Sequence, residues 1–228
     1  MNIEIVQGPG NAAAKVSLGA NETITAESGS MIAMNSHLHM NTTTHSRGGA
    51  GGLLKAVKRM FAGESFFLNH YKAGQEGGDV YLSTPLPGDM MTHELNDESL
   101  IVQARSFVAC GDDVDVDLGW QGFKSLLSGE SMFWIHLKGT GPVILNSFGA
   151  IYPIEVDGDV LVDTGHIVAF QDTLDFSITK AGKSWLHSFM GGEGLVCRFH
   201  GTGTVWCQSH NPPSFGLQLG PMLKRRPR

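Results

Sequence analysis

Three segments of the chain share one pattern of apolar and polar positions. Each starts with an apolar residue, an isoleucine or valine, an alanine and another apolar residue. After three further positions come two apolar residues separated by one position. The segments begin at Met31, Phe107 and Ile167, at successive offsets of 76 and 60 residues. Alternation with a period of two is typical of a strand with one buried face, so we predict half-buried strands in all three segments.

A second marker follows each of these segments. It is a Gly-Glu pair that opens an apolar run, and a glycine-containing turn and another apolar run come after it. The pairs are Gly63-Glu64, Gly129-Glu130 and Gly192-Glu193, the turns lie at 74–78, 139–141 and 201–203, and the closing runs lie at 80–82, 143–145 and 205–207. Two apolar runs around a glycine turn are typical of a β-hairpin, so the pattern predicts three hairpins.

Between the two markers, each copy carries apolar residues at steps of three and four. These steps place the apolar residues of 53–61, 120–127 and 185–190 on one face of a short helix. Two markers and a helix occur in the same order three times. This regularity predicts three tandem repeats.

The repeats divide the chain into units at 1–83, 84–147 and 148–228, the last with a basic C-terminal tail. We predict an all-β fold with one short helix in each unit. A unit of about 65 to 80 residues buries little surface by itself, so we expect the three to pack into one body with a pseudo-threefold arrangement. Their edge strands need cover, and association between chains is one way to provide it.

Composition and charge narrow the functional classes. The 228 residues carry a formal net charge of −6 at pH 7, which argues against a general affinity for nucleic acid. No apolar stretch approaches the roughly 20 residues of a membrane-spanning helix, and the first ten residues lack the pattern of a secretion signal. Three cysteines are too few for a disulfide framework. Together these features predict a cytoplasmic protein.

Several glycine-containing motifs resemble the signature of a known family. They are Gly48-Gly49-Ala50-Gly51-Gly52-Leu53-Leu54, Gly63-Glu64-Ser65-Phe66-Phe67, Gly129-Glu130-Ser131 and Ala181-Gly182-Lys183-Ser184-Trp185. The family is a widespread and uncharacterised bacterial one, and its eukaryotic relatives include the mitochondrial-biogenesis protein called altered inheritance of mitochondria twenty-four. The resemblance covers essentially the whole chain.

The resemblance implies a particular architecture. Each repeat would be a short double-stranded β-helix like that of the tryptophan RNA-binding attenuation protein, and three chains would form a homotrimeric ring of nine units. Similarity of fold does not carry over an RNA site. No lysine or arginine recurs at equivalent places in the three units, so RNA binding is an alternative by fold analogy alone.

His37 and His39 have the spacing of two metal ligands on one face of a strand. A cupin-like protein that binds a metal or a small ligand through them is therefore another alternative. However, aspartate and threonine stand at the aligned positions of the other two copies. An outward polar face accounts for all three copies, so we predict neither a metal site nor a cofactor.

Motifs for covalent or phosphate chemistry are incomplete. The Gly182-Lys183-Ser184 run lacks the earlier glycine of a P-loop, and no Gly-x-Ser-x-Gly elbow occurs. Cys197 and Cys207 flank the turn at 201–203 symmetrically and would face each other across the predicted hairpin. Apolar residues take their places in the second copy, which favours core packing over redox chemistry. We therefore predict that the protein is not an enzyme.

Two basic segments are the candidate contact sites. They contain Lys55, Lys58 and Arg59 on the polar face of the first predicted helix, and Lys224, Arg225 and Arg226 in the C-terminal tail. A basic amphipathic helix can lie on an anionic membrane, and its apolar stripe can equally pack against the β body. Together with the trimer that the family resemblance implies, the sequence predicts a non-enzymatic, homotrimeric β scaffold that binds a protein partner or a membrane surface.

Overall fold

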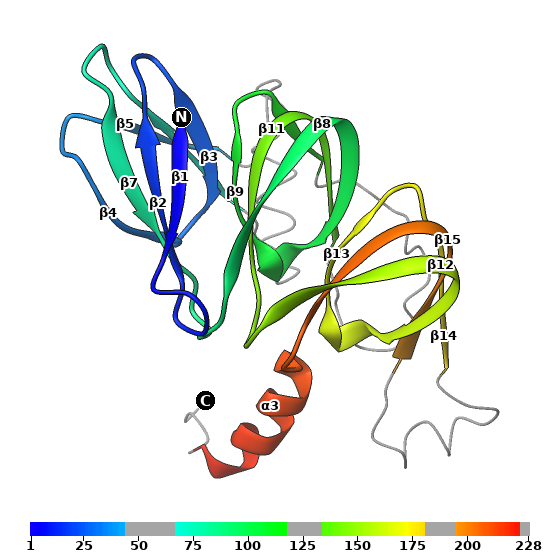
Figure 1. Cartoon of the computed structure of the whole chain (residues 1–228). Helices are drawn as coiled ribbons and strands as arrows, with labels where there is room; N and C mark the ends of the chain where they lie inside the picture. Colours follow the sequence, from blue (N-terminus) through cyan, green and yellow to red (C-terminus); the bar gives the residue numbers. More distant parts are fainter. Residues whose placement is uncertain (44–66, 118–133, 181–194, 224–228) are drawn as a thin grey trace.

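The computed structural model describes residues 1–43, 67–117, 134–180 and 195–223. Its regular structure is almost entirely β, which confirms the predicted fold class at that level (Figure 1). The elements are β1 (Asn2–Val6), β2 (Ala13–Leu18), β3 (Thr23–Glu27), β4 (Met31–Met34), β5 (His39–Thr43), β6 (Leu68–Lys72), β7 (Gly78–Leu82), β8 (Met90–Gln103), η1 (Ala104–Ser106), β9 (Phe107–Gly111), β10 (Val114–Asp117), β11 (Trp134–Asn146), β12 (Ile151–Asp163), η2 (Thr164–His166), β13 (Ile167–Gln171), β14 (Asp175–Lys180), β15 (Leu195–Gln208), α3 (Pro212–Leu219) and η3 (Gly220–Met222).

The strands form two sheets with antiparallel pairing. One sheet has four strands in the order β1-β2-β7-β4. The other has eleven, along the path β12-β15-β13-β8-β11-β9-β3-β6-β5, with β10 beside β11 and β14 beside β15. Figure 1 shows three groups side by side. We call β1–β7 the first group, β8–β11 the second group and β12–β15 the third group.

The second and third groups have the same strand pairing. In the second group the long strands β8 and β11 pair along almost their whole length. The short strands β9 and β10 both pair with β11, β9 near its C-terminal end and β10 near its N-terminal end. In the third group β12, β13, β14 and β15 take the places of β8, β9, β10 and β11.

The first group makes these pairings with broken strands. β2 pairs with β7 and β3 pairs with β6, so β2 and β3 together correspond to β8, while β6 and β7 correspond to β11. β4 pairs with β7 and β5 pairs with β6, as β9 and β10 pair with the two ends of β11. β1 is an additional strand beside β2. The unit boundaries at 83 and 147 stay a prediction.

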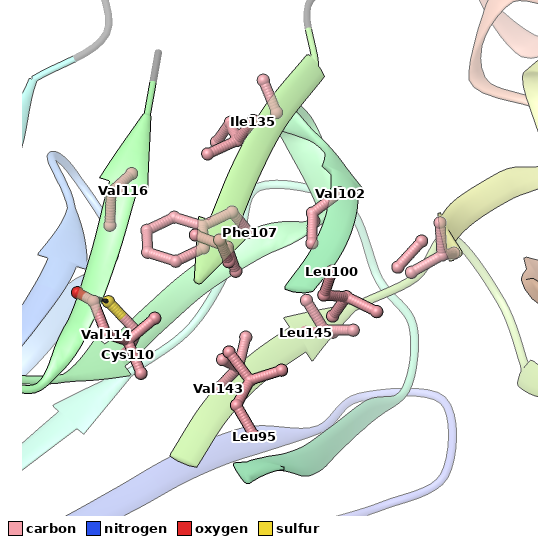
Figure 2. Packing of buried hydrophobic residues seen from close by; sticks show 14 of the residues in the cluster. Leu95, Leu100, Val102, Phe107, Cys110, Val114, Val116, Ile135, Val143 and Leu145 are labelled. Carbon is pink, nitrogen blue, oxygen red and sulfur yellow. Dashed lines mark hydrogen bonds between the residues drawn. The ribbon is translucent and has the colours of Figure 1, made fainter. Parts of the chain in front are cut away.

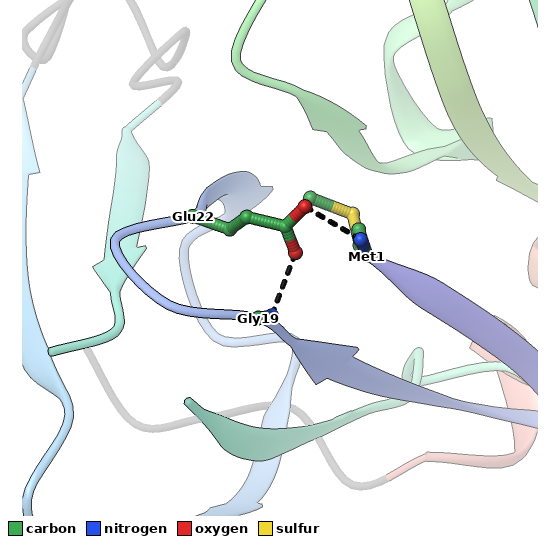
Figure 3. Close-up of polar contacts among 3 residues, drawn as sticks. All are labelled: Met1, Gly19 and Glu22. Carbon is green, nitrogen blue, oxygen red and sulfur yellow. Dashed lines mark hydrogen bonds and ion pairs between the residues drawn. The ribbon is translucent and has the colours of Figure 1, made fainter. Parts of the chain in front are cut away.

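A polar contact closes the break between β2 and β3 (Figure 3). Glu22 Oε2 accepts a hydrogen bond from the Gly19 amide over 2.7 Å, and Oε1 lies 2.6 Å from the Met1 ammonium nitrogen. The hydrogen bond from the Met1 ammonium, followed by that from the Gly19 amide, lowers the pKa of the Glu22 carboxyl. The carboxylate therefore ties this turn to the start of β1.

The prediction of three hairpins is wrong. β11 and β15 each run as one strand through the glycines of the expected turn, and in the first group the two apolar runs belong to β6 and β7 in different sheets. The reason is the length of the partner strands, because β8 and β12 pair on both sides of these glycines. Gly139 and Gly141, with φ of 132° and 131°, let β11 bend where its register with β8 shifts.

The bend lets both halves of a long strand contribute to one core. Ile135 and Leu137 come from one half of β11, Val143 and Leu145 come from the other, and all four belong to one cluster with Phe107 of β9 (Figure 2). All five side chains are fully buried. Removal of such apolar surface from water, at about 25 cal/mol per Å², is the main source of stability in the group.

The repeated apolar pattern marks real strands. Met31, Phe107 and Ile167 are the first residues of β4, β9 and β13, so strands occur where they were predicted. The predicted half-burial does not hold for these strands, because β9 is buried throughout and β4 is mostly exposed. The acidic segment after Cys110 also forms a strand, β10. The predicted helices at 53–61, 120–127 and 185–190 lie outside the described residues.

The helix α3 follows β15 and was not predicted. Its first turn is capped by Asn211, whose Oδ1 accepts a hydrogen bond from the Ser214 amide over 3.1 Å, and Pro212 is its first residue. None of its residues is buried. Its described ring contact is between Phe215 and Phe148, whose centroids lie 5.4 Å apart.

Candidate functional site

Two strand pairings join the three groups. At the first joint, β9 of the second group pairs with β3 of the first group, and Cys110 lies opposite Thr25. At the second joint, β13 of the third group pairs with β8 of the second group, and Phe170 lies opposite Ile101. Each joint therefore covers an edge strand of one group with a short strand of the next group along the chain.

Each joint also buries a bulged residue of the short strand. The pairing of β9 with β11 skips Val108, and the pairing of β13 with β15 skips Val168. Both valines are 0% exposed. Val108 belongs to the apolar cluster centred on the first group, and Val168 belongs to the cluster centred on the second group. The short strands thus insert apolar side chains into the core of the preceding group.

β4 is built like β9 and β13, yet within the described ranges its outer edge has no partner strand. Its pairing with β7 skips Ile32 in the same way. Ile32 is 58% exposed and Met31 is 40% exposed. Ala33 is also exposed, whereas the corresponding Ala109 and Ala169 are fully buried. β4 therefore presents to solvent the positions that β9 and β13 bury.

β12 carries the complementary edge. Its second half corresponds to β3 and to the second half of β8, which each receive a short strand. The matching residues are Thr25, Ile101 and Leu161, which pair with equivalent positions of β6, β11 and β15. Leu161 is 61% exposed, whereas Ile101 is 0% and Thr25 is 6% exposed. In the part of the chain that the structure describes, β12 pairs with β15 alone.

The polar groups beside the joints and beside the β12 edge differ. At the second joint, His136 Nε2 lies 3.3 Å from Asp172 Oδ2. At the first joint, the corresponding His70 ring forms a hydrogen bond with the Thr25 hydroxyl over 2.8 Å. On the third group the corresponding residue is Arg198, which is exposed and bonds a carboxylate of β12. The three sites share the same place in the strand pairing, and the polar and charged groups beside them differ.

The arrangement of the whole chain matches known proteins. A family model described as mitochondrial biogenesis AIM24 matches residues 3–210. The chain belongs to this family. An uncharacterised protein of Streptococcus pyogenes serotype M6 is 29% identical over 198 residues, which cover 85% of this AIM24 family member and 79% of that relative. The crystal structure of a Streptococcus pyogenes protein is 26% identical, with a TM-score of 0.79 and coverage of 97% of this chain and 99% of the other. The family resemblance is thereby confirmed.

The candidate metal ligands of this AIM24 family member lie on its surface. His37 Nε2 is 2.9 Å from the carbonyl oxygen of Gly77, and His39 is exposed at the start of β5. Nε2 of His37 must carry a proton to donate to a carbonyl, so that nitrogen has no lone pair for a metal. The described residues contain no group of three or more histidine, cysteine, aspartate or glutamate side chains placed to hold a metal ion.

Cys197 and Cys207 do not face each other across a hairpin, because both lie in the single strand β15. Cys197 is opposite Val162, and Cys207 is opposite Tyr152. Both thiols are free and buried within the cluster of the third group. Burial raises the pKa of each thiol to about 12, so both are protonated at neutral pH and act as small apolar groups.

The basic contact candidates fall outside the described residues. They are Lys55, Lys58, Arg59, Lys224, Arg225 and Arg226. Beside the tail, the described segment that includes α3 and η3 exposes Leu217 (78%) and Met222 (81%). None of the helices described is long and apolar enough to cross a bilayer.

Sequence analysis missed the two open edges. One signal was present, since the repeated pattern aligns Ile32 with Val108 and Val168. Whether an aligned residue is buried depends on a strand far away in the chain, so the pattern alone does not separate an internal joint from an open edge.

Proposed function

We propose that this AIM24 family member is a non-enzymatic β scaffold whose copies join through β4 of one chain and β12 of the next. The observation that carries the proposal is the exposure of Ile32 and Leu161. Both occupy positions that are buried at the internal joints of the same chain. One neighbouring copy on each side would cover the two edges with the pairing that the chain already uses twice.

The proposed contact is head-to-tail, because it joins two different surfaces. Such contacts form closed rings when the rotation between neighbours closes, and open filaments when it does not. The family resemblance implies closure after three chains, with each group acting as one short double-stranded β-helix. A cytoplasmic homotrimer of nine groups is therefore the assembly that we propose.

The role of this ring is to bind a protein partner or a membrane surface. Basic residues are concentrated near 55–59 and 224–228, while the net charge of the chain is −6. The second segment directly follows α3 and η3, whose exposed apolar residues include Leu217, Met222 and Leu223. Apolar side chains beside basic ones suit an interface with an acidic partner or an anionic headgroup layer.

The experiment is a measurement of mass in solution by light scattering and native mass spectrometry. We expect about 73.5 kDa, three times the 24.5 kDa of one chain. Ile32→Asp and Leu161→Asp should each give monomers, because every head-to-tail contact then includes an edge with a charge at its centre. Leu217→Asp is the matched control, since Leu217 is also exposed but lies on α3, and it should leave the mass unchanged.

Mixing the two variants sharpens the test. An Ile32→Asp chain keeps a working β12 edge, and a Leu161→Asp chain keeps a working β4 edge. A head-to-tail contact therefore predicts a one-to-one dimer in the mixture. A wild-type monomer, or variants that keep the full mass, would contradict the assembly, and a mixture that stays monomeric would contradict the pairing of β4 with β12.

A further inference from the structure

A cavity of about 340 Å³ opens between the first and second groups. Four segments line it: the end of β3 with the turn that follows, the segment after β7, η1 and the end of β11. The lining residues are Glu27, Ser28, Gly29, Ser30, Ser83, Pro85, Leu86, Arg105 and Asn146. Its volume lies in the range of about 300–1,000 Å³ that is usual for small-molecule sites.

In the other two groups, amide side chains fill the equivalent space beside η1 and η2. Three residues hold the same place in the three groups, directly after the last residue that pairs with the short strand. They are Ser83 after β7, Asn146 at the end of β11 and Gln208 at the end of β15. Gln208 accepts a hydrogen bond from the Phe148 amide over 2.8 Å and donates to the Gly165 carbonyl over 2.9 Å. The Asn146 amide nitrogen, in the orientation that satisfies its neighbours, donates to carbonyls of η1. Ser83 is too short to fill the same space, so the first group keeps a cavity there.

Glu27 lines this cavity, and its carboxyl group has no hydrogen-bond partner among the described residues. The corresponding Asp163 of the third group accepts hydrogen bonds from the Gly165 amide and the Asn211 side chain. Among the described hydrogen bonds and ion pairs, the Glu27 carboxyl takes part in none, although it is partly buried. Burial raises its pKa to about 7, so the group is only partly ionised at neutral pH.

Arg105 brings the opposite charge to the same cavity. Arg105 is exposed and lines the cavity, and in the described parts of the chain its guanidinium forms no ion pair or hydrogen bond. Glu27 and Arg105 line one cavity and do not bond each other. The apolar part of the wall comes from Pro85 and Leu86. The cavity thus offers one negative and one positive group with an apolar surface.

We propose that this cavity binds a small zwitterion, a free amino acid in the simplest case, with its ammonium group at Glu27 and its carboxylate at Arg105. A guanidinium suits a carboxylate because it can donate two parallel hydrogen bonds. A carboxylate that is shielded from water gains more from an ammonium partner than an exposed one does. Pro85 and Leu86 would contact an apolar side chain of the ligand. The proposal does not depend on assembly of the chain.

The proposal predicts a rise in affinity with pH. The ammonium group pairs with the ionised carboxylate of Glu27, which forms as the pH rises through about 7. An alkyl amine keeps its proton over this range, and Arg105 stays charged. Apparent affinity should therefore increase about tenfold from pH 6 to pH 8 and level off above that, because the ionised fraction of a group with this pKa rises by about that factor.

The test is calorimetric titration of the full chain with L-leucine and its two singly charged analogues, 3-methylbutylamine and 4-methylpentanoate. L-Alanine serves as a probe with little apolar surface. Leucine should bind with the pH profile above, and each analogue should bind at least tenfold more weakly. Absence of binding by both amino acids at millimolar concentration would overturn the proposal, as would equal binding of the amine and leucine.

Four variants separate this site from non-specific effects. Glu27→Gln should remove the pH dependence and weaken leucine binding at least tenfold at pH 8, and Arg105→Gln should weaken it similarly. Ser83→Asn should abolish binding while both charges remain, because it introduces the side chain that fills the turn of the second group. Glu98→Gln, at an exposed site on β8, is the matched control. Unchanged affinity in Glu27→Gln or in Ser83→Asn would contradict the assignment.

Discussion

The internal joints and the open edges of this chain share a backbone plan and differ in burial. β4, β9 and β13 all carry a bulge at their second residue, which is Ile32, Val108 or Val168. The two valines are fully buried at the joints, whereas Ile32 is 58% exposed. The difference lies in the presence of a neighbouring group and not in the short strand itself. An apolar residue at a repeated bulge is therefore evidence for a docking position even where no neighbour is in place.

The largest expected difference in unfolding free energy is between aspartate substitutions at Val168, in a joint, and at Ile32, on an open edge. Val168→Asp places an unpaired charge in a closed joint and should cost about 4 kcal/mol or more of unfolding free energy. Ile32→Asp changes an exposed residue. Its unfolding free energy should lie within about 0.5 kcal/mol of that of Leu161→Asp, the other variant that is expected not to form the closed ring. Urea denaturation followed by circular dichroism measures both. Equal losses for Val168→Asp and Ile32→Asp would remove the distinction between joint and edge.

A smaller effect concerns the polar group beside the second joint. His136 Nε2 lies 3.3 Å from Asp172 Oδ2 where the second and third groups meet, and the His136 side chain is 21% exposed. His136→Ala should cost about 1 kcal/mol, because it removes both this contact and some packing. His200→Ala is the control, since its side chain is 63% exposed and it sits beside the exposed Asp159. A loss for His200→Ala as large as that for His136→Ala would show that the joint adds nothing to this pair.

The smallest expected effect tests the broken strand of the first group. The pKa of Glu22 is lowered by the Met1 ammonium and the Gly19 amide, so its contribution is present above the ordinary carboxyl pKa and is lost as the pH falls through the lowered value. The carboxylate is 37% exposed, so solvent screening limits this contribution to below about 0.5 kcal/mol. Glu22→Gln should lower the unfolding free energy at pH 7 by this small amount, and it should lose less stability than the wild type as the pH falls below about 4.5, where the two proteins converge. Identical acid profiles for the two proteins would show that this contact does not stabilise the turn.

Local patterns predicted part of this fold correctly. The repeated pattern found β10 because period-two alternation depends only on which face of a strand is buried: Val114 and Val116 are buried there, and Asp115 is exposed. The hairpin prediction was wrong because a glycine such as Gly139 or Gly201 has the same sequence pattern at a hairpin turn and at a bend within one strand. The deciding feature is the length of β8 and β12, which pair on both sides of the glycines.

The candidate sites were harder to predict, for a related reason. The cavity beside Glu27 exists because Ser83 stands where the other groups have Asn146 and Gln208, a comparison that needs the strand ends to be known. The open edge of β12 depends on which strands lie beside it. The helix α3 had a local signal that sequence analysis did not use, an asparagine followed by two prolines and a serine.

The direction of the joints has a consequence for how the chain is made. Each short strand docks backward, onto a group that has already left the ribosome, so the first joint can close as soon as β9 emerges and the second as soon as β13 does. The edge of β4 is available early, but its complement on β12 is synthesised about half the chain later. Two nascent chains therefore have few opportunities to exchange strands before each has closed its own joints. The order of synthesis itself favours correct pairing within the chain.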